Sequence, residues 1–362
     1  MTTRPVMIMA GGTGGHVYPA LTIAKALEAK QQPVFWLGTH RGLEARVVPA
    51  NGIDIEWVSV KGLRRKGVAA MLVAPLQLAW ALLQSLNAIR RRRPAAVLGM
   101  GGFVSGPGGL AAWLTRRPLV IHEQNATAGL TNRLLARLAR VVLQAFPGSF
   151  KSRVAAETVG NPVRPDIAAI AAPAVRYPER DGPLRLLVLG GSQGALALNR
   201  LVPAALARLP AERRPIVRHQ CGERTRDTAA ALYRNSGIEV EIQSFIEDMA
   251  EAYAWADAVV CRAGALTVAE IAAAGLPAIF IPYPAAVDDH QTANARGLCD
   301  AGAAITVQER DLDESRLAEL LDDFLDTRNA LQERAERARA LAAPDALMTI
   351  TRHCLTLAGG PA

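Results

Sequence analysis

The sequence predicts an α/β protein of two domains, each built on a doubly wound parallel sheet. Two observations lead to this prediction. Short apolar stretches alternate with helical patterns along the chain, and each half opens with an apolar stretch, a glycine-rich loop and a helix. Such alternation is typical of strands buried in parallel sheets. The length of 362 residues also favours two domains, because a domain takes about 150 residues.

The first half begins with an apolar strand at residues 6–10 and a glycine-rich loop at 11–16. Pro19 is expected to open the helix that follows and ends near Glu28, because the first turn of a helix tolerates a missing N–H. A second glycine-rich loop occupies residues 101–109. The further strands expected in this half are residues 34–37, 95–100, 119–121 and 141–144.

The second half repeats the pattern with a strand at 184–189, a glycine-rich loop at 190–194 and a helix at 195–209. Two prolines near Asn161 interrupt the pattern, which divides the chain into residues 1–163 and 164–341. We expect two Rossmann-like domains facing a cleft, and a last helix at 345–357 that could pack on either of them. The further strands expected are residues 216–219, 240–242, 258–261 and 278–281.

Charge is distributed unevenly along the chain. Residues 1–163 contain 20 Lys and Arg against 6 Asp and Glu, a net +14, whereas residues 164–362 contain 21 against 27, a net −6. A basic half joined to an acidic half indicates that the first half meets a polyanionic surface, either nucleic acid or anionic lipid. Aromatic residues make up only 5% of the chain, which argues against stacking platforms for single-stranded nucleic acid.

Residues 61–93 consist of an apolar stretch, 68–89, between two basic clusters. Its length approaches the ~20 residues of a membrane span, but Pro75 and several polar residues argue against one. An interfacial helix that places Leu76, Trp80 and Leu83 at the headgroup boundary fits better. The alternative is a buried helix between solvated arginines, although four consecutive arginines favour contact with anionic lipid.

The three glycine-rich loops are suited to phosphate, because glycine lets the backbone approach a ligand and the next helix presents free N–H groups. None of them matches the dinucleotide fingerprint or a Walker loop, and each alone could be a tight turn. Together they indicate phosphate-bearing ligands. The four cysteines form no C-x-x-C pair and no carboxylate pair stands out, so we predict no metal and no cofactor.

Three polar features at expected strand ends suggest chemistry. His16 ends the first loop, where a neutral imidazole could act as a general base; the alternative is a capping or core histidine. Glu270 falls on the first turns of a helix, where it could bind a ribose diol or only complement the helix dipole. Residues 122–125, His-Glu-Gln-Asn, form a polar cluster.

Six segments together resemble one family: residues 11–16, 99–107, 122–125, 160–164, 190–194 and 261–277. In this order and spacing the chain is similar to the bacterial MurG family, which are UDP-GlcNAc-dependent N-acetylglucosaminyltransferases of peptidoglycan synthesis. The resemblance implies a GT-B glycosyltransferase fold in which the last helix, at 342–362, returns to the N-terminal domain. It also implies a hexosyltransferase that moves GlcNAc to the C4 hydroxyl of MurNAc in lipid I (undecaprenyl-pyrophosphoryl-MurNAc-pentapeptide), giving lipid II.

The resemblance further implies the partners and the place of action. They are UDP-GlcNAc, lipid I and the anionic membrane surface, with no nucleic acid, at the cytoplasmic face of the inner membrane, where the enzyme is peripheral and serves cell-wall biogenesis, cell shape and cell division. His16 would be the catalytic base. The donor site implied is Thr13, Gly14, Gly15, Asn125, Arg164, Ser192, Ile246, Ala265, Leu266, Thr267, Val268, Ala269, Glu270 and Gln291. The acceptor loops implied are Gly12, Gly101, Gly102, Ser105 and Gly106.

Within these assignments Ser192 contacts a donor phosphate, Ile246 the uracil through its backbone, and Glu270 the ribose hydroxyls. The sequence departs from many relatives at Ala285, where a larger polar residue is common, and this affects the detail of the sugar pocket. Three other functions agree less well with the sequence. A UDP-GlcNAc 2-epimerase would need no lipid-facing segment, a nicotinamide-dependent oxidoreductase needs an acid ~20 residues after a proper fingerprint, and a non-enzymatic adaptor leaves three phosphate loops unexplained.

Overall fold

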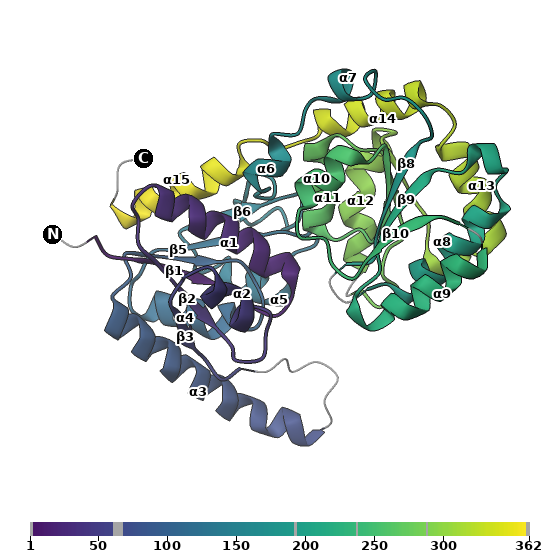
Figure 1. Ribbon diagram of the computed structural model, residues 1–362. Coiled ribbons are helices and arrows are strands. Elements are labelled where there is room, and N and C mark those ends of the chain that lie inside the picture. The colour runs from purple at the N-terminus through teal and green to yellow at the C-terminus, as the bar shows by residue number, and fades with distance from the viewer. Residues whose placement is uncertain (1–2, 61–67, 192–193, 237, 287–288, 360–362) are drawn as a thin grey trace. The chain divides into compact units, whose positions relative to one another are not determined.

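The computed structural model describes residues 3–60, 68–191, 194–236, 238–286 and 289–359 (Figure 1). The chain divides into two compact units. Unit 1 is Met1–Pro162 with Asp345–Ala362, and unit 2 is Val163–Pro344. This division lies one residue before the expected boundary, and the returning C-terminal segment begins at Asp345 rather than at 342.

Unit 1 is built on a parallel sheet whose described strands follow the order β3-β2-β1-β4-β5-β6-β7. Its strands are β1 (Val6–Met9), β2 (Val34–Gly38), β3 (Ile55–Trp57), β4 (Ala96–Gly99), β5 (Leu119–Glu123), β6 (Val141–Gln144) and β7 (Glu157–Thr158). Its helices are α1 (Gly14–Ala29), α2 (Glu44–Ala50), α3 (Val68–Arg92), α4 (Ser105–Leu114), α5 (Leu130–Leu135) and α15 (Ala346–Ala358).

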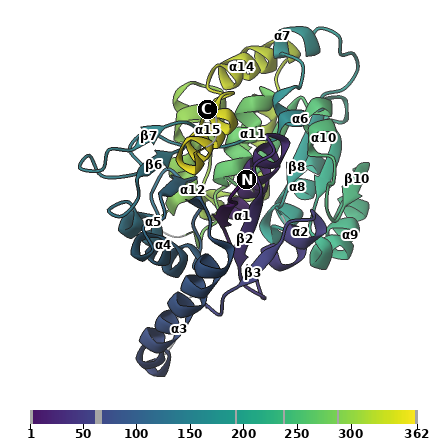
Figure 2. The ribbon, with the colours of Figure 1, turned by 90° about the vertical axis from the view of Figure 1, so that its left-hand side faces the viewer.

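Both faces of this sheet are buried at its centre, which explains why the central strands β1 and β4 are apolar throughout rather than alternating. In β1, Val6 and Ile8 face one core cluster, to which α1 and α15 contribute. Met7 and Met9 face the opposite cluster, to which α3, α4 and α5 contribute. Helix α15 packs against α1, as Figures 1 and 2 show, so the last helix lies on the N-terminal sheet.

Unit 2 is built on a second parallel sheet whose described strands follow the order β10-β9-β8-β11-β12-β13. Its strands are β8 (Arg185–Leu189), β9 (Ile216–Gln220), β10 (Val240–Gln243), β11 (Ala258–Cys261), β12 (Ala278–Phe280) and β13 (Ala304–Thr306). Its α-helices are α6 (Pro165–Ala168), α7 (Pro173–Arg176), α8 (Leu196–Arg208), α9 (Arg226–Ser236), α10 (Met249–Trp255), α11 (Ala265–Ala274), α12 (His290–Asp300), α13 (Glu314–Phe324) and α14 (Arg328–Ala340). Three 3-10 helices are η1 (Ala211–Arg213), η2 (Glu223–Thr225) and η4 (Glu309–Asp311).

The two sheets confirm the predicted α/β class with two doubly wound domains. Every strand expected from the sequence is present, with its ends within two residues of the expected positions. Strands β3, β7 and β13 were not expected. They are edge strands of only two or three residues, so the sequence contains no apolar run long enough to predict them.

Two expectations about glycine and proline were wrong. Helix α1 begins at Gly14, and Pro19 lies inside it rather than opening it, so the Gly15 carbonyl receives no helical bond from Pro19. Residues 106–109 belong to helix α4, not to a loop. A Cβ on Gly108 would lie 2.3 Å from the Met9 sulfur, so glycine here permits close packing of a helix on the sheet.

Candidate functional site

His16 lies in the first turn of α1, beyond the carboxyl end of β1, and is half-buried. Its Nδ1 is 2.8 Å from Oε1 of Gln124, at the end of β5. Gly101, at the end of β4, lies against the ring. A Cβ there would be 3.0 Å from His16 Cε1, and the φ of +93° also favours glycine. The expected base is therefore held by two loops of unit 1 that follow neighbouring strands.

The glycine-rich loops at 11–16 and 101–105 touch one another. A Cβ on Gly102 would lie 2.4 Å from the Gly11 carbonyl oxygen, so only glycine permits this contact. The buried hydroxyl of Ser105 lies 2.7 Å from the Gly101 carbonyl oxygen and 3.1 Å from that of Met9. Ser105 thus supports the loops from inside, whereas Gly12, Thr13 and Gly15 are exposed and Gly14 and Gly106 are half-buried.

Glu44, at the start of α2, is a residue of this site that sequence reasoning missed. It is fully buried, and its Oε2 accepts a hydrogen bond from the Gly12 N–H at 3.0 Å. Its Oε1 accepts bonds from the Thr39 N–H at 3.1 Å and the Thr39 hydroxyl at 2.7 Å. The Gly12 amide therefore donates to a carboxylate in this structure. The expected role of this loop in binding the acceptor pyrophosphate stays a prediction.

The polar cluster at residues 122–125 forms one buried network. His122 is fully buried, and burial lowers its pKa to about 4. Its Nε2 lies 2.9 Å from the Gly160 carbonyl oxygen, and its Nδ1 lies 3.0 Å from Nε2 of Gln124. Glu123 accepts bonds from both the backbone and side-chain N–H groups of Asn125 at 3.0 and 3.2 Å. Asn125 is therefore oriented by an acid beneath it.

The donor residues expected in unit 2 gather at helix α11, which follows β11. Ala265, Leu266, Thr267, Val268 and Ala269 form its first turns. Glu270 is buried one turn into the helix, where it accepts a bond from the Tyr253 hydroxyl at 3.1 Å and pairs with Arg164 at 3.4 Å. Burial raises the pKa of Glu270, although Arg164 and Tyr253 favour its ionised form.

The glycine-rich loop of unit 2 is held by Gln220, the last residue of β9. Its Oε1 accepts a bond from the Gly191 N–H at 2.9 Å, and its Nε2 donates to the Gly191 carbonyl oxygen at 2.9 Å. Sequence reasoning missed this residue, because nothing near the loop points to it. Ser192, the expected phosphate contact, lies outside the described residues.

The remaining donor residues take separate positions in unit 2. Ile246 is buried just before α10. Gln291, in the first turn of α12, accepts a bond from the Tyr283 N–H at 2.8 Å. Arg262, which follows β11, directs its guanidinium to Glu309 and to two backbone carbonyl groups.

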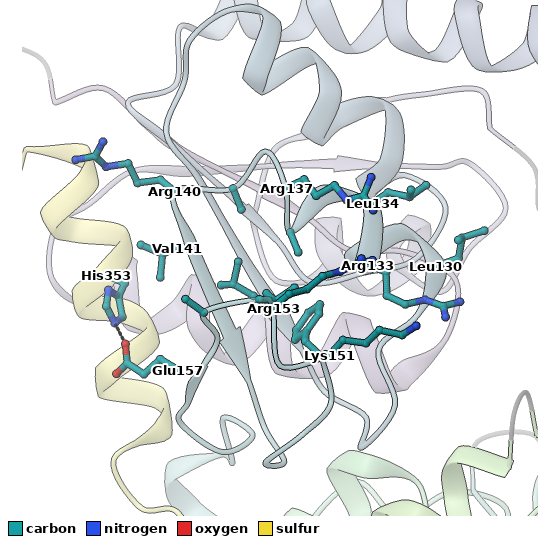
Figure 3. A pocket seen from close by; sticks show the side chains of 16 residues that line it. Leu130, Arg133, Leu134, Arg137, Arg140, Val141, Lys151, Arg153, Glu157 and His353 are labelled. Carbon is teal, nitrogen blue, oxygen red and sulfur yellow. Dashed lines mark hydrogen bonds and ion pairs between the residues drawn. The ribbon is translucent and has the colours of Figure 1, made fainter.

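A pocket of about 750 Å³ opens in unit 1 around α5 (Figure 3). Apolar residues line part of its wall, and its one acid, Glu157, is bonded to His353 at 3.0 Å. No acid among the described residues forms an ion pair with the five basic side chains that line it. These are Arg133, Arg137, Arg140, Lys151 and Arg153.

Large apolar side chains are exposed on the neighbouring helices. Helix α3 packs against α4, and α4 against α5. Leu76, Trp80 and Leu83 on α3 are 57–72% exposed, so the alternative of a helix buried on all sides is wrong. The others on this set of helices are Leu78, Leu110, Trp113, Leu114, Leu130 and Leu134. Among the described residues, none of the helices combines the length and the apolar composition of a membrane span.

The described residues also include no group of three or more His, Cys, Asp or Glu side chains arranged to hold a metal ion.

The comparisons with known proteins agree with the two-unit fold. The N-terminal domain of glycosyltransferase family 28 matches residues 6–144, and the C-terminal domain of the same family matches residues 185–350. These two domains confirm the expected GT-B glycosyltransferase fold.

Individual relatives match nearly the whole chain. A protein of Alkalilimnicola ehrlichii is 58% identical over 353 residues, covering 98% of this chain and 99% of that protein. One of Nitrosococcus oceani is 53% identical over 355 residues, covering 98% and 99%. Both are named UDP-N-acetylglucosamine–N-acetylmuramyl-(pentapeptide) pyrophosphoryl-undecaprenol N-acetylglucosamine transferase.

A crystal structure of MurG from Acinetobacter baumannii is similar to this structure with a TM-score of 0.84 and 41% identity, covering 98% of this chain and 99% of that one. The identity, the coverage and the two domain matches agree. This chain therefore belongs to glycosyltransferase family 28 and, within it, to the MurG family.

Proposed function

We propose that this protein transfers GlcNAc from UDP-GlcNAc to the lipid-linked MurNAc-pentapeptide, converting lipid I to lipid II. The observation that carries the proposal is the 58% identity, over 98% of the chain, to a transferase named for this reaction. The site geometry supports it, because unit 1 presents a half-buried histidine beyond a strand end and unit 2 presents a helix N-terminus with a buried acid.

The reaction is a single displacement with inversion at C1 of GlcNAc. The C4 hydroxyl of MurNAc forms a bond to C1 while the bond from C1 to the UDP oxygen breaks. His16 accepts the hydroxyl proton on Nε2, and UDP leaves with the electron pair. General base catalysis of this kind contributes typically about 10²–10⁴-fold to the rate.

The donor binds to unit 2. The N–H groups in the first turn of α11 and the positive end of its dipole suit a diphosphate. Glu270 accepts hydrogen bonds from the ribose hydroxyls, and Arg164, which is paired with it, keeps the carboxylate oriented. The neutral Gln220 under the Gly191 loop adds no negative charge beside the leaving group.

The acceptor lies in a membrane, and unit 1 carries features suited to its anionic surface. The exposed apolar side chains of α3, α4 and α5 can enter the headgroup boundary. The unpaired basic residues of the pocket beside α5 attract anionic headgroups at about 1 kcal/mol for each charge near the surface. We propose peripheral binding at the cytoplasmic face of the inner membrane, with no role for nucleic acid.

The decisive experiment mixes the purified protein with UDP-GlcNAc and a soluble lipid I analogue and follows release of UDP. Release that requires the acceptor, together with a disaccharide product, supports the transferase. Conversion of UDP-GlcNAc in the absence of an acceptor would keep the fold and assign the protein to the epimerases instead. A His16→Ala variant that turned over within a few-fold of the wild type would remove His16 from the mechanism.

A further inference from the structure

Two histidines of unit 1, His16 and His122, are joined through the side chain of Gln124. His16 Nδ1 lies 2.8 Å from Gln124 Oε1, Gln124 Nε2 lies 3.0 Å from His122 Nδ1, and His122 Nε2 lies 2.9 Å from the Gly160 carbonyl oxygen. His122 and Gln124 are both buried, with 0% and 1% of their surface exposed. The donors and acceptors in this series of hydrogen bonds follow from its carbonyl groups, which can only accept.

The Gly160 carbonyl group can only accept a hydrogen bond, so Nε2 of His122 carries a proton. Burial keeps His122 neutral by lowering its pKa to about 4. A neutral imidazole has one N–H group, so Nδ1 of His122 is an acceptor. Gln124 must therefore turn its NH₂ group, not its oxygen, toward His122.

A second acceptor fixes the same amide orientation independently. Nε2 of Gln124 lies 2.9 Å from the His122 backbone carbonyl oxygen, so the two amide hydrogens have two acceptors. Rotating the amide by half a turn would place its oxygen against that carbonyl oxygen. Oε1 of Gln124 therefore faces His16, and it can only accept.

We propose that Gln124 and His122 are positioning residues that hold neutral His16 with its proton on Nδ1, leaving Nε2 bare to receive the proton of the acceptor hydroxyl. This inference rests on the proposed role of His16 as the general base. The nearest precedent in mechanism is the serine-protease triad, where the wrong histidine tautomer lowers kcat about 10⁴-fold. Here the partner is an uncharged amide, which selects the tautomer without adding a charge beside the base.

The test combines ¹⁵N NMR with kinetics. In protein labelled with ¹⁵N-histidine, protonated and bare ring nitrogens give distinct signals, and the His16 signals are those that a His16→Gln variant lacks. At a pH where His16 is neutral, we expect its proton on Nδ1 and that of His122 on Nε2. Gln124→Leu removes the acceptor, and we expect His16 to lose its single tautomer and kcat to fall at least about 10²-fold, while KM for UDP-GlcNAc changes less than about 3-fold.

Gln144→Leu is the matched control, because Gln144 is a buried glutamine of the adjacent strand β6 whose side chain bonds Thr158 and Phe150 instead. Its kcat should stay at the wild-type value. Wild-type His16 with its proton on Nε2 would overturn the proposal, as would Gln124→Leu with unchanged kcat. The wild-type spectrum decides the question even if Gln124→Leu does not fold. Since it needs no turnover, it also separates failure of this inference from failure of the proposed reaction.

Discussion

Glu44 offers the sharpest test of how the first glycine-rich loop is held. Its buried carboxylate accepts three hydrogen bonds, one from Gly12 and two from Thr39. In Glu44→Gln the amide oxygen can still face the two donors of Thr39, but the amide nitrogen then faces the Gly12 N–H, and a donor cannot accept. The variant therefore loses the bond to the loop while it keeps the side-chain volume.

The magnitude follows from the bond that is lost. A hydrogen bond to a charged group contributes about 1.5–3 kcal/mol, so we expect Glu44→Gln to lower the free energy of unfolding by about 2 kcal/mol, measured by urea denaturation. Release of Gly12 also moves the loop that leads into His16. A displacement of about 1 Å can cost about 10²-fold in rate, so we expect kcat for UDP release to fall by a factor of that order.

Thr39→Val is the matched control, because it removes one hydrogen bond to Glu44 but leaves the bond from Gly12 in place. We expect a loss of about 1.5–3 kcal/mol in stability, similar to that of Glu44→Gln because the lost bond is also to the carboxylate, but a kcat close to that of the wild type. The reasoning is refuted if the two variants reduce kcat equally, or if Glu44→Gln unfolds at the same urea concentration as the wild type.

Three further predictions concern donor binding, the loop contact and pH. Glu270→Gln should weaken binding of UDP-GlcNAc about 10–100-fold in calorimetry, since a hydrogen bond to a charged group contributes about 1.5–3 kcal/mol. The variant should be no less stable than the wild type, because burial penalises the carboxylate. Unchanged affinity would contradict the prediction. Gly102→Ala should lower the unfolding free energy by about 1–3 kcal/mol, because its φ is +81° and a Cβ would lie 2.4 Å from the Gly11 carbonyl oxygen; an unchanged melting temperature would argue against that contact. Burial lowers the pKa of His122 to about 4 and of His219 to about 3, so the unfolded chain binds protons that the folded chain does not. The stabilisation by these two neutral histidines is therefore fully present above about pH 7. The free energy of unfolding falls as the pH drops through about 6.5 toward 4, by up to about 1.4 kcal/mol per pH unit for each histidine. In urea denaturation the decline should be shallower for His219→Phe than for the wild type, and equal slopes would contradict this.

The amino-acid sequence was sufficient to predict the two parallel sheets and the positions of their main strands. Apolar runs such as β1 and β8, each followed by glycine and a helix, reflect backbone periodicity and burial. Both can be predicted from residues that are close together in the sequence. The exposed face of α3 was also predictable, because Leu76, Trp80 and Leu83 follow one another at intervals of about one helical turn. His16 stood out for the same local reason, since it ends a glycine-rich loop after a strand.

The side chains that hold the loops could be identified only once the chain was folded. Glu44 is 32 residues from Gly12, Gln220 is 29 residues from Gly191, and Gln124 is 108 residues from His16. These partners meet because of strand order, which places β1 between β2 and β4, β4 beside β5, and β8 beside β9. Periodicity marks where strands occur but not which strands pair, and a buried hydrogen bond forms only where the pairing brings donor to acceptor. The direction of the Gln124 bonds, and with it the tautomer of His16, is therefore a property of the folded sheet.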